Sequence, residues 1–334
     1  MSTLRETEIR PHDLMAGQRA AQEADIAWLL ERKSSFVAVP CPACAADEGT
    51  PALEKDGFSY ARCPQCRTMY MTPRPSPDVL VEFYATSRNY AYWNEHIFPA
   101  SEEARREKIF RPRAERVAGF VERYGTGTRA LVEVGAGFGT FCEEIGARGL
   151  FRRVVGIEPT PDLAETCRQR GIEVIDRPIE EVNLPGGIAD VVASFETIEH
   201  LFSPREFVQR CAELLAPGGL LVLTCPNGLG FDVLVLGARS SAVDNEHLNY
   251  FNPESLAQVV RKCGLEVLEV STPGKLDAEL VRKQALDGEI DLETQPFLRR
   301  VLLDDWERVG APFQQFLADN LLSSHMWLVA CRGN

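Results

Sequence analysis

The chain has 334 residues, a formal net charge of −13 and 45% hydrophobic residues. That length predicts two folded units or one decorated domain, and the composition is that of an ordinary globular protein. An acidic surface repels phosphate backbones and disfavours a nucleic-acid partner. No apolar run approaches the roughly 18–20 residues that span a bilayer, and the N-terminus lacks the apolar core of a signal peptide. We therefore expect a cytoplasmic protein with no membrane partner.

The N-terminal third changes character along its length. Residues 1–36 have a weak helical pattern, and residues 37–72 contain short β-like pieces with two cysteine pairs. The run Pro73–Pro77 predicts a stiff extended connector, because proline fixes its own φ and restrains the preceding residue. Residues 73–125 then form a helical connector or cap. Its arginines between positions 105 and 116 alternate with glutamates, which predicts a solvated helix face.

From residue 129 the sequence alternates strand and helix signals. Expected strands are Ala130–Val134, Arg153–Ile157, Gly171–Ile175, Ala189–Phe195, Leu220–Thr224, Leu265–Val270 and His325–Cys331. Such alternation predicts an α/β domain over residues 126–334, with a mostly parallel sheet covered by helices on both faces. A helix-rich insertion over 274–322 separates the last two strands. The pattern of this insertion is compatible both with a segment that lines an acceptor pocket and with one that forms a homodimer contact.

Four cysteines have the spacing of a metal site. Cys41 and Cys44 form one C-x2-C pair, Cys63 and Cys66 form another, and 18 residues separate the pairs. This lies within the range typical of zinc ribbons, and thiols stay reduced in the cytosol. Four thiolates close a tetrahedral Zn²⁺ site with no open position, so the ion would be structural and would supply folding energy to a short segment. Two pairs disfavour a redox dithiol, and an iron–sulfur centre remains an alternative.

A glycine-rich loop follows the first expected strand of the α/β domain. Gly135, Gly137 and Gly139 lie where the strand turns into a helix, which lets the backbone approach a ligand closely. Nicotinamide and flavin enzymes use similar loops. Glu133, two residues before the first glycine, disfavours a pyrophosphate and suits the cationic methionyl end of a sulfonium ligand. Glu158 ends the second strand about 20 residues later, where an acid can bind two ribose hydroxyls.

The glycine loop, Glu158, the strand Ala189–Phe195 and the turn Pro217–Gly219 together resemble the successive motifs of class I S-adenosylmethionine-dependent methyltransferases. The resemblance implies a Rossmann-like seven-stranded sheet, S-adenosylmethionine as the cofactor and methyl transfer as the reaction. Pro178 stands where such proteins often have an acid facing adenine, so the adenine contact is expected through the backbone near Ile179. The implied cofactor-binding residues are Glu133, Gly135, Gly137, Gly139, Glu158, Ile179 and Phe195.

The ribbon followed by the proline-rich connector resembles the N-terminal module of bacterial methyltransferases that act on sugars and other secondary metabolites. This implies a small-molecule acceptor, with a sugar or nucleotide-sugar favoured, and a ribbon at the mouth of the active site. A family of ribosomal-RNA guanine methyltransferases also has an N-terminal zinc ribbon. RNA methylation therefore stays an alternative, against which the acidic charge counts.

An acid–histidine cluster follows the fourth strand of the domain. If that loop turns helically, Glu196, Glu199 and His200 share one face, and His247 lies near the same rim. Two carboxylates and two imidazoles suit a divalent ion with open water positions. The pattern resembles the metal site of small-RNA 2′-O-methyltransferases and, in part, that of ubiquinone-biosynthesis O-methyltransferases. This implies Mg²⁺ or Mn²⁺ as a second ion, with Glu199, His200 and His247 as the catalytic candidates.

The sequence is compatible with several interpretations of this cluster and of the function of the whole chain. A histidine can serve as a metal-free base or only pack, and His325 is expected to be a strand-end residue. We expect methyl transfer to a hydroxyl of a small acceptor, while methylation of a keto-sugar carbon needs the same base. A cofactor-binding regulator without turnover and a ribbon that binds a protein partner are the non-enzyme alternatives.

Overall fold

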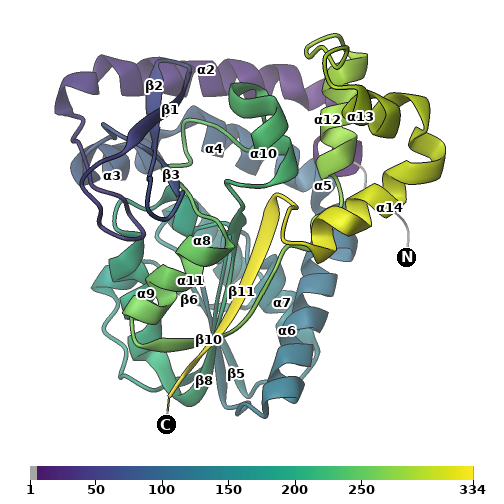
Figure 1. The fold of residues 1–334 in the computed structure, drawn as a ribbon. Helices are drawn as coiled ribbons and strands as arrows, with labels where there is room; N and C mark the ends of the chain where they lie inside the picture. The colour runs from purple at the N-terminus through teal and green to yellow at the C-terminus, as the bar shows by residue number, and fades with distance from the viewer. Residues whose placement is uncertain (1–5, 334) are drawn as a thin grey trace.

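A computed structural model describes residues 6–333, which form two sheets surrounded by helices (Figure 1). The larger sheet has seven strands in the order β10-β11-β8-β7-β4-β5-β6. Only β11 runs antiparallel to its neighbours, so the predicted Rossmann-like sheet is confirmed. The strands are β4 (Ala130–Val134), β5 (Arg153–Ile157), β6 (Glu173–Ile175), β7 (Ala189–Phe195), β8 (Leu215–Pro226), β10 (Leu265–Ser271) and β11 (His325–Arg332).

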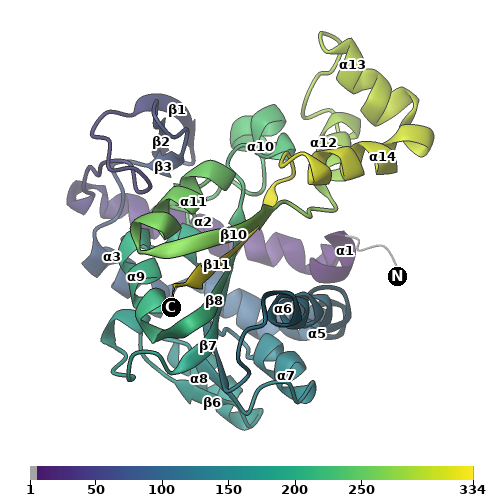
Figure 2. The ribbon, with the colours of Figure 1, turned by 60° about the horizontal axis from the view of Figure 1, so that its bottom comes forward.

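Helices cover both faces of this sheet, because alternate strand residues point to opposite sides. Val132 and Leu221 pack in one core with α9 (Pro204–Leu214) and α11 (Pro253–Lys262). Leu131 and Val222 pack in a second core with α6 (Arg111–Tyr124) and α7 (Thr140–Ala147). Figure 2 shows these two helix pairs on opposite sides of the strands. A further helix of the α/β unit, α8 (Pro161–Gln169), lies between β5 and β6 along the chain.

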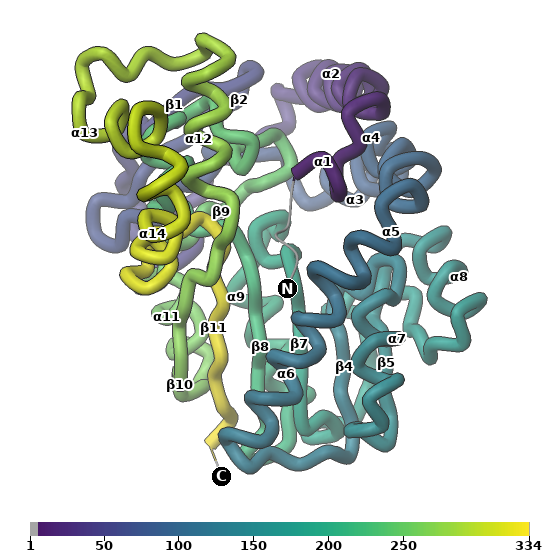
Figure 3. The backbone as a smooth tube through the Cα atoms, turned by 90° about the vertical axis from the view of Figure 1, so that its right-hand side faces the viewer, coloured from purple at the N-terminus to yellow at the C-terminus, as the bar shows by residue number. Residues whose placement is uncertain are grey.

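The N-terminal helices lie over the end of the sheet that carries the glycine loop (Figure 3). Phe98 stacks on Phe138 of that loop with ring centroids 3.5 Å apart. Asp25 fixes the start of α4, since its carboxylate accepts hydrogen bonds from Ser87 Oγ at 2.6 Å and from the Asn89 amide at 2.9 Å. The elements are α1 (Glu6–Ile9), α2 (Met15–Glu31), α3 (Pro77–Thr86), α4 (Arg88–Tyr92) and α5 (Phe98–Arg105), with π-helical turns at Trp93–Ile97 and Arg106–Phe110.

The smaller sheet joins the cysteine-containing segment to a distant part of the chain. Its strands are β1 (Thr50–Lys55), β2 (Phe58–Arg62), β3 (Met69–Met71) and β9 (Asn249–Tyr250), in that order. We expected residues 37–72 to form a unit of their own, but the sheet takes its fourth strand from the α/β domain. A two-residue strand is too short to show a period of two, so no local pattern predicts it.

The insertion between β10 and β11 forms a small helical unit beside that edge of the sheet (Figures 1 and 2). It contains α12 (Asp277–Leu286), α13 (Pro296–Arg299) and α14 (Trp306–Asp319), which pack against α10 (Phe231–Leu236) around their own core. Asp277 anchors it by accepting from Gln314 Nε2 at 2.6 Å and from Ser323 Oγ.

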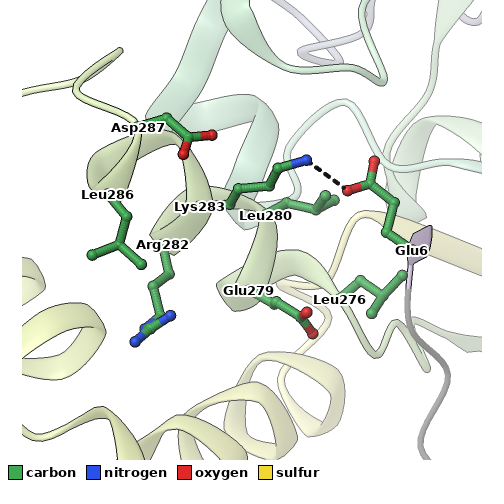
Figure 4. Close-up of a pocket in the computed structure, with 8 residues that line it drawn as sticks. All are labelled: Glu6, Leu276, Glu279, Leu280, Arg282, Lys283, Leu286 and Asp287. Carbon is green, nitrogen blue, oxygen red and sulfur yellow. Dashed lines mark hydrogen bonds and ion pairs between the residues drawn. The ribbon is translucent and has the colours of Figure 1, made fainter. Parts of the chain in front are cut away.

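A pocket of about 200 Å³ lies between Glu6 and α12, where Lys283 pairs with Glu6 at 3.2 Å (Figure 4). It shares no lining residue with the acid–histidine cluster. Within residues 6–333, no helix has the length and apolar character needed to cross a membrane.

Candidate cofactor and acceptor site

The glycine loop adopts backbone conformations that favour glycine. The φ angles of Gly135, Gly137 and Gly139 are +80°, +55° and +73°. A Cβ at Gly135 would lie 2.5 Å from Thr197 Oγ1, so this part of the loop packs against the turn after β7. A Cβ at Gly137 would meet no atom within 4 Å. The loop therefore packs against the turn after β7 at Gly135 and has free space beside Gly137.

Glu158 faces the open part of the loop from the end of β5. Its carboxylate accepts hydrogen bonds from the Gly137 amide at 2.7 Å and from the Thr160 amide at 2.9 Å. The side chain is buried, and burial raises its pKa. Ile179, the residue expected near adenine, is also buried, in a short 3-10 turn after β6. The carboxylate thus faces the glycine loop, with its oxygens engaged by backbone donors.

Glu133 and Phe195 are both buried, like Glu158 and Ile179. Glu133 accepts a hydrogen bond from the Cys142 thiol at 3.0 Å, and burial raises its pKa to about 8. The ring of Phe195 packs against Phe141 at 4.7 Å and Trp327 at 5.8 Å between ring centroids. The ring of Phe195 is therefore part of the core that also contains Phe141 and Trp327.

Arg113 is a charged residue whose position the sequence analysis missed. Its guanidinium lies 4.3 Å above the ring of Phe195. Burial lowers its pKa, and the charges of Glu196 and Glu133 oppose that shift. Among residues 6–333 it has neither a hydrogen-bond partner nor an ion pair. The prediction of a solvated helix face is thus wrong for Arg113, which is a half-buried cation above Phe195 and able to receive an anion.

Glu199, His200 and His247 converge after β7. One candidate ligand atom from each lies within 4.8 Å of the others, and the two imidazole centroids are 4.7 Å apart. His200 Nδ1 lies 3.2 Å from the Glu246 carbonyl oxygen, and His247 Nδ1 lies 2.8 Å from that of Ala242. These partners assign the proton to Nδ1 in both rings, which leaves both Nε2 atoms with a free lone pair.

The Glu199 carboxylate is fully buried, and neither of its oxygens has a hydrogen-bond partner in the described part of the chain. Burial, with the charge of Glu196, raises its pKa well above the ordinary value. Burial, with the charge of His247, lowers the pKa of His200 to about 3. An unpaired buried carboxylate is costly unless a cation compensates it. An orphaned carboxylate beside two imidazoles whose Nδ1 atoms face carbonyl oxygens is a donor set that fits a metal ion.

Glu196 does not share this face, contrary to expectation. Its φ is +51°, and the helical turn begins only at Ile198. The carboxylate accepts from Thr224 Oγ1 at 2.5 Å and lies 2.9 Å from His325 Nε2. The predicted four-residue set is thus reduced to two imidazoles and one carboxylate. Such a set favours a first-row transition metal over Mg²⁺, which prefers oxygen ligands.

The N-terminal helices add polar groups to the acid–histidine cluster. Tyr84 Oη lies 3.5 Å from the His200 carbonyl oxygen, and Asn89 Nδ2 donates to Glu246 at 2.6 Å. Burial raises the pKa of Glu246 to about 8. Asn245 is buried, and none of the described residues accepts a hydrogen bond from its Nδ2. Amides, a phenol and a carboxyl group next to the imidazoles can bind hydroxyl groups of a small ligand.

The four cysteines form two turns of the same geometry. The Ala45 and Arg67 amides donate to the Cys41 and Cys63 carbonyls, and both donors have positive φ, +66° and +61°. Ligand atoms of all four cysteines lie within 4.8 Å of one another. Cys41 Sγ lies 3.4 Å from Cys66 Sγ, and Cys44 Sγ lies 3.4 Å from Cys63 Sγ. The donor set and the paired knuckles fit a tetrahedral zinc ion.

Comparison with known proteins places the chain in a family. Residues 103–270, half of the chain, match the methyltransferase domain family, and the chain belongs to that family. It is 28% identical over 165 residues to a probable S-adenosylmethionine-dependent methyltransferase of Mycolicibacterium smegmatis, covering 49% of this chain and 58% of that protein.

Two relatives carry names that specify the methylated atom. A C-methyltransferase, NovU, of Streptomyces niveus is 29% identical over 195 residues, covering 55% of this chain and 44% of that protein. A ubiquinone biosynthesis O-methyltransferase of Xanthomonas euvesicatoria is 30% identical over 160 residues, covering 43% of this chain and 65% of that protein. The chain thus spans about half the length of several curated relatives, and relatives of both oxygen and carbon specificity match it.

Proposed function

We propose that the protein transfers a methyl group from S-adenosylmethionine to a hydroxyl of a small hydroxylated acceptor, with a sugar or nucleotide-sugar favoured. Membership of the methyltransferase domain family supports the reaction class. The observation that carries the proposed acceptor chemistry is the orphaned Glu199 carboxylate beside the free Nε2 atoms of His200 and His247. The polar groups from α2–α4 next to it suit a ligand with several hydroxyls.

In this proposal the chain's residues align the reactants and remove a proton, because a sulfonium methyl group is already activated. Glu158 and the glycine loop orient the cofactor. Glu199, His200 and His247 would hold a divalent ion, whose chemistry is to acidify a bound hydroxyl. Tyr84, Asn89 and Glu246 orient the acceptor. The Cys41, Cys44, Cys63 and Cys66 site would hold a structural Zn²⁺.

The alternative is carbon methylation without a metal, which the NovU match favours. His247 would then be the proton acceptor. Its Nδ1 is held by the Ala242 carbonyl and lies 3.6 Å from Asp244 Oδ2, a carboxylate placed to stabilise the imidazolium. His200 is the poorer base, because burial and His247 hold its pKa near 3. Both alternatives use one site and differ in the atom that is methylated.

We further propose that Arg113 binds the carboxylate of the cofactor's methionyl group. Arg113→Gln is expected to weaken S-adenosylhomocysteine binding by about 10- to 100-fold, the loss of one charge-assisted contact. Binding of 5′-methylthioadenosine, which lacks the amino-acid end, should change less than about twofold. Calorimetric titration of both ligands measures this, with Arg123→Gln on the exposed part of α6 as the control. Equal losses for the two ligands would contradict the assignment.

The methylated atom is tested with labelled S-adenosylmethionine and a panel of hexoses, nucleotide-sugars, keto-sugars and catechols. We expect a methyl ether product, located by mass spectrometry and NMR, and no product from Glu158→Ala. A label on carbon would replace the proposal with the C-methylation alternative. Binding of S-adenosylhomocysteine without transfer to any of these compounds would favour a cofactor-binding regulator.

A further inference from the structure

We propose that the cysteine ribbon is a structural part of the acid–histidine centre, with Asn249 and Arg74 as the positioning residues that connect them. This inference concerns the geometry of Glu199, His200 and His247 and rests on the proposed function of that centre. It assigns a role to two fully buried polar residues that belong to neither the glycine loop nor the four-cysteine set.

Asn249 holds the backbone of the turn that carries Glu199 and His200. It is completely buried on β9, and its Nδ2 donates to the carbonyl oxygens of Ile198, Glu199 and Leu201 at 3.4, 3.3 and 2.7 Å. The amide of the preceding residue, Leu248, also donates to the Glu199 carbonyl, at 2.8 Å. One asparagine amide therefore contacts three carbonyls of a turn too short to fix itself.

Arg74 fixes the orientation of this asparagine. It is 1% exposed, and its Nη1 donates to Asn249 Oδ1 at 3.1 Å and to the Phe202 carbonyl at 3.3 Å. Its Nε donates to the Met71 carbonyl at 3.2 Å. Because the arginine occupies the amide oxygen, Nδ2 must face the turn. Arg74 thus links the Met71 carbonyl of β3 to the Phe202 carbonyl, just after the acid–histidine turn. Through Asn249 it is also linked to the turn itself.

The ribbon strand β3 completes the connection. Tyr70 pairs with Asn249, and the Met71 amide donates to the Leu248 carbonyl at 2.9 Å. β3 begins three residues after Cys66, whose carbonyl accepts from Asn252 Nδ2 at 2.8 Å. His247 immediately precedes this paired segment. The knuckle of Cys63 and Cys66 is therefore linked through β3 and β9 to both imidazoles, and disorder in the ribbon should change their separation.

The test compares the histidine rings by ¹H–¹⁵N NMR at neutral pH in wild type and Asn249→Asp. Aspartate keeps the size of the side chain and still accepts from Arg74, but it cannot donate to the three carbonyls. Wild type should show the Nδ1–H tautomer for His200 and His247, assigned with His200→Gln and His247→Gln. In Asn249→Asp we expect both signals to shift toward mixed tautomers and Mn²⁺ affinity to fall at least tenfold.

Asn227→Asp is the matched control. Asn227 is also completely buried, and its Nδ2 donates to the Leu321 and Ser323 carbonyls at 3.3 and 3.0 Å. It should leave both histidine signals unchanged. Arg74→Lys is measured in parallel and should show the same tautomer shift, so the test does not depend on one variant folding.

Wild-type tautomers in folded Asn249→Asp or Arg74→Lys would overturn the inference. If wild type bound no Mn²⁺, the proposed metal site would fail, but the tautomer comparison would still decide the positioning role.

Discussion

Glu199→Gln should make the protein more stable and nearly inactive. In protein with no ion added beyond the ribbon zinc, the variant is expected to gain about 1–3 kcal/mol in free energy of unfolding at neutral pH, because an unpaired buried carboxyl becomes a neutral amide. Methyl transfer should fall at least about 100-fold, since the amide is a poor metal ligand. Chemical denaturation and a methyl-transfer assay measure the two effects.

The pH dependence of stability shows whether ionisation of Glu199 stabilises or destabilises the folded chain. The folded-state pKa of Glu199 is raised by burial, and those of Glu133 and Glu246 are raised to about 8 from 4.5. Between these values the folded chain holds protons on these carboxyl groups that the unfolded chain has released, so their contribution to stability falls as pH rises through about 4.5 to 8. Glu199→Gln should reduce this slope. A less stable variant, or an unchanged slope, would contradict the account of Glu199 as an unpaired acid.

Cys63→Ser should have the largest effect on folding. Structural zinc in isolated finger peptides contributes roughly 10–16 kcal/mol of folding free energy, and a ribbon of this size has little core of its own. Its strands β2 and β3 also pack against Leu29 of α2 and Tyr250 of β9. Loss of the ion should therefore loosen the N-terminal helices as well, with a melting temperature lowered by more than about 10 °C or loss of soluble protein.

Metal analysis and thermal unfolding check this prediction, with Cys331→Ser near the C-terminal end of β11 as the control. Wild type and the control should contain one zinc per chain. Visible absorption with bound iron would instead identify the iron–sulfur alternative. A Cys63→Ser protein with the melting temperature of wild type would contradict a structural role for the four-cysteine cluster.

Local sequence patterns predicted the α/β core well because strand and helix periods are local properties. The strands Ala130–Val134, Arg153–Ile157 and Ala189–Phe195 have the expected bounds, and the order of elements predicted a mostly parallel sheet. The cysteine spacing likewise placed four thiols together. In each of these cases the sequence signal lies within one element or in a repeated short motif.

Contacts between distant segments were not predictable in the same way. Glu196 meets His325, 129 positions away, and a left-handed backbone at Glu196 separates it from Glu199. β9 joins the ribbon sheet with only two residues. Arg113 lies next to the buried face of α6, and the alternating charges around it concealed this position. Spacing along the chain carries no information about which distant side chain satisfies a given charge.

The central claim, that Glu199, His200 and His247 form a metal site in a methyltransferase, is tested most directly by calorimetric titration of Mn²⁺ and Mg²⁺ into protein saturated with S-adenosylhomocysteine. The account predicts one Mn²⁺ site per chain, weaker binding of Mg²⁺, and no binding in Glu199→Gln or His247→Ala. Absence of Mn²⁺ binding in wild type, or equal binding in the variants, would contradict it and leave His247 as a metal-free base.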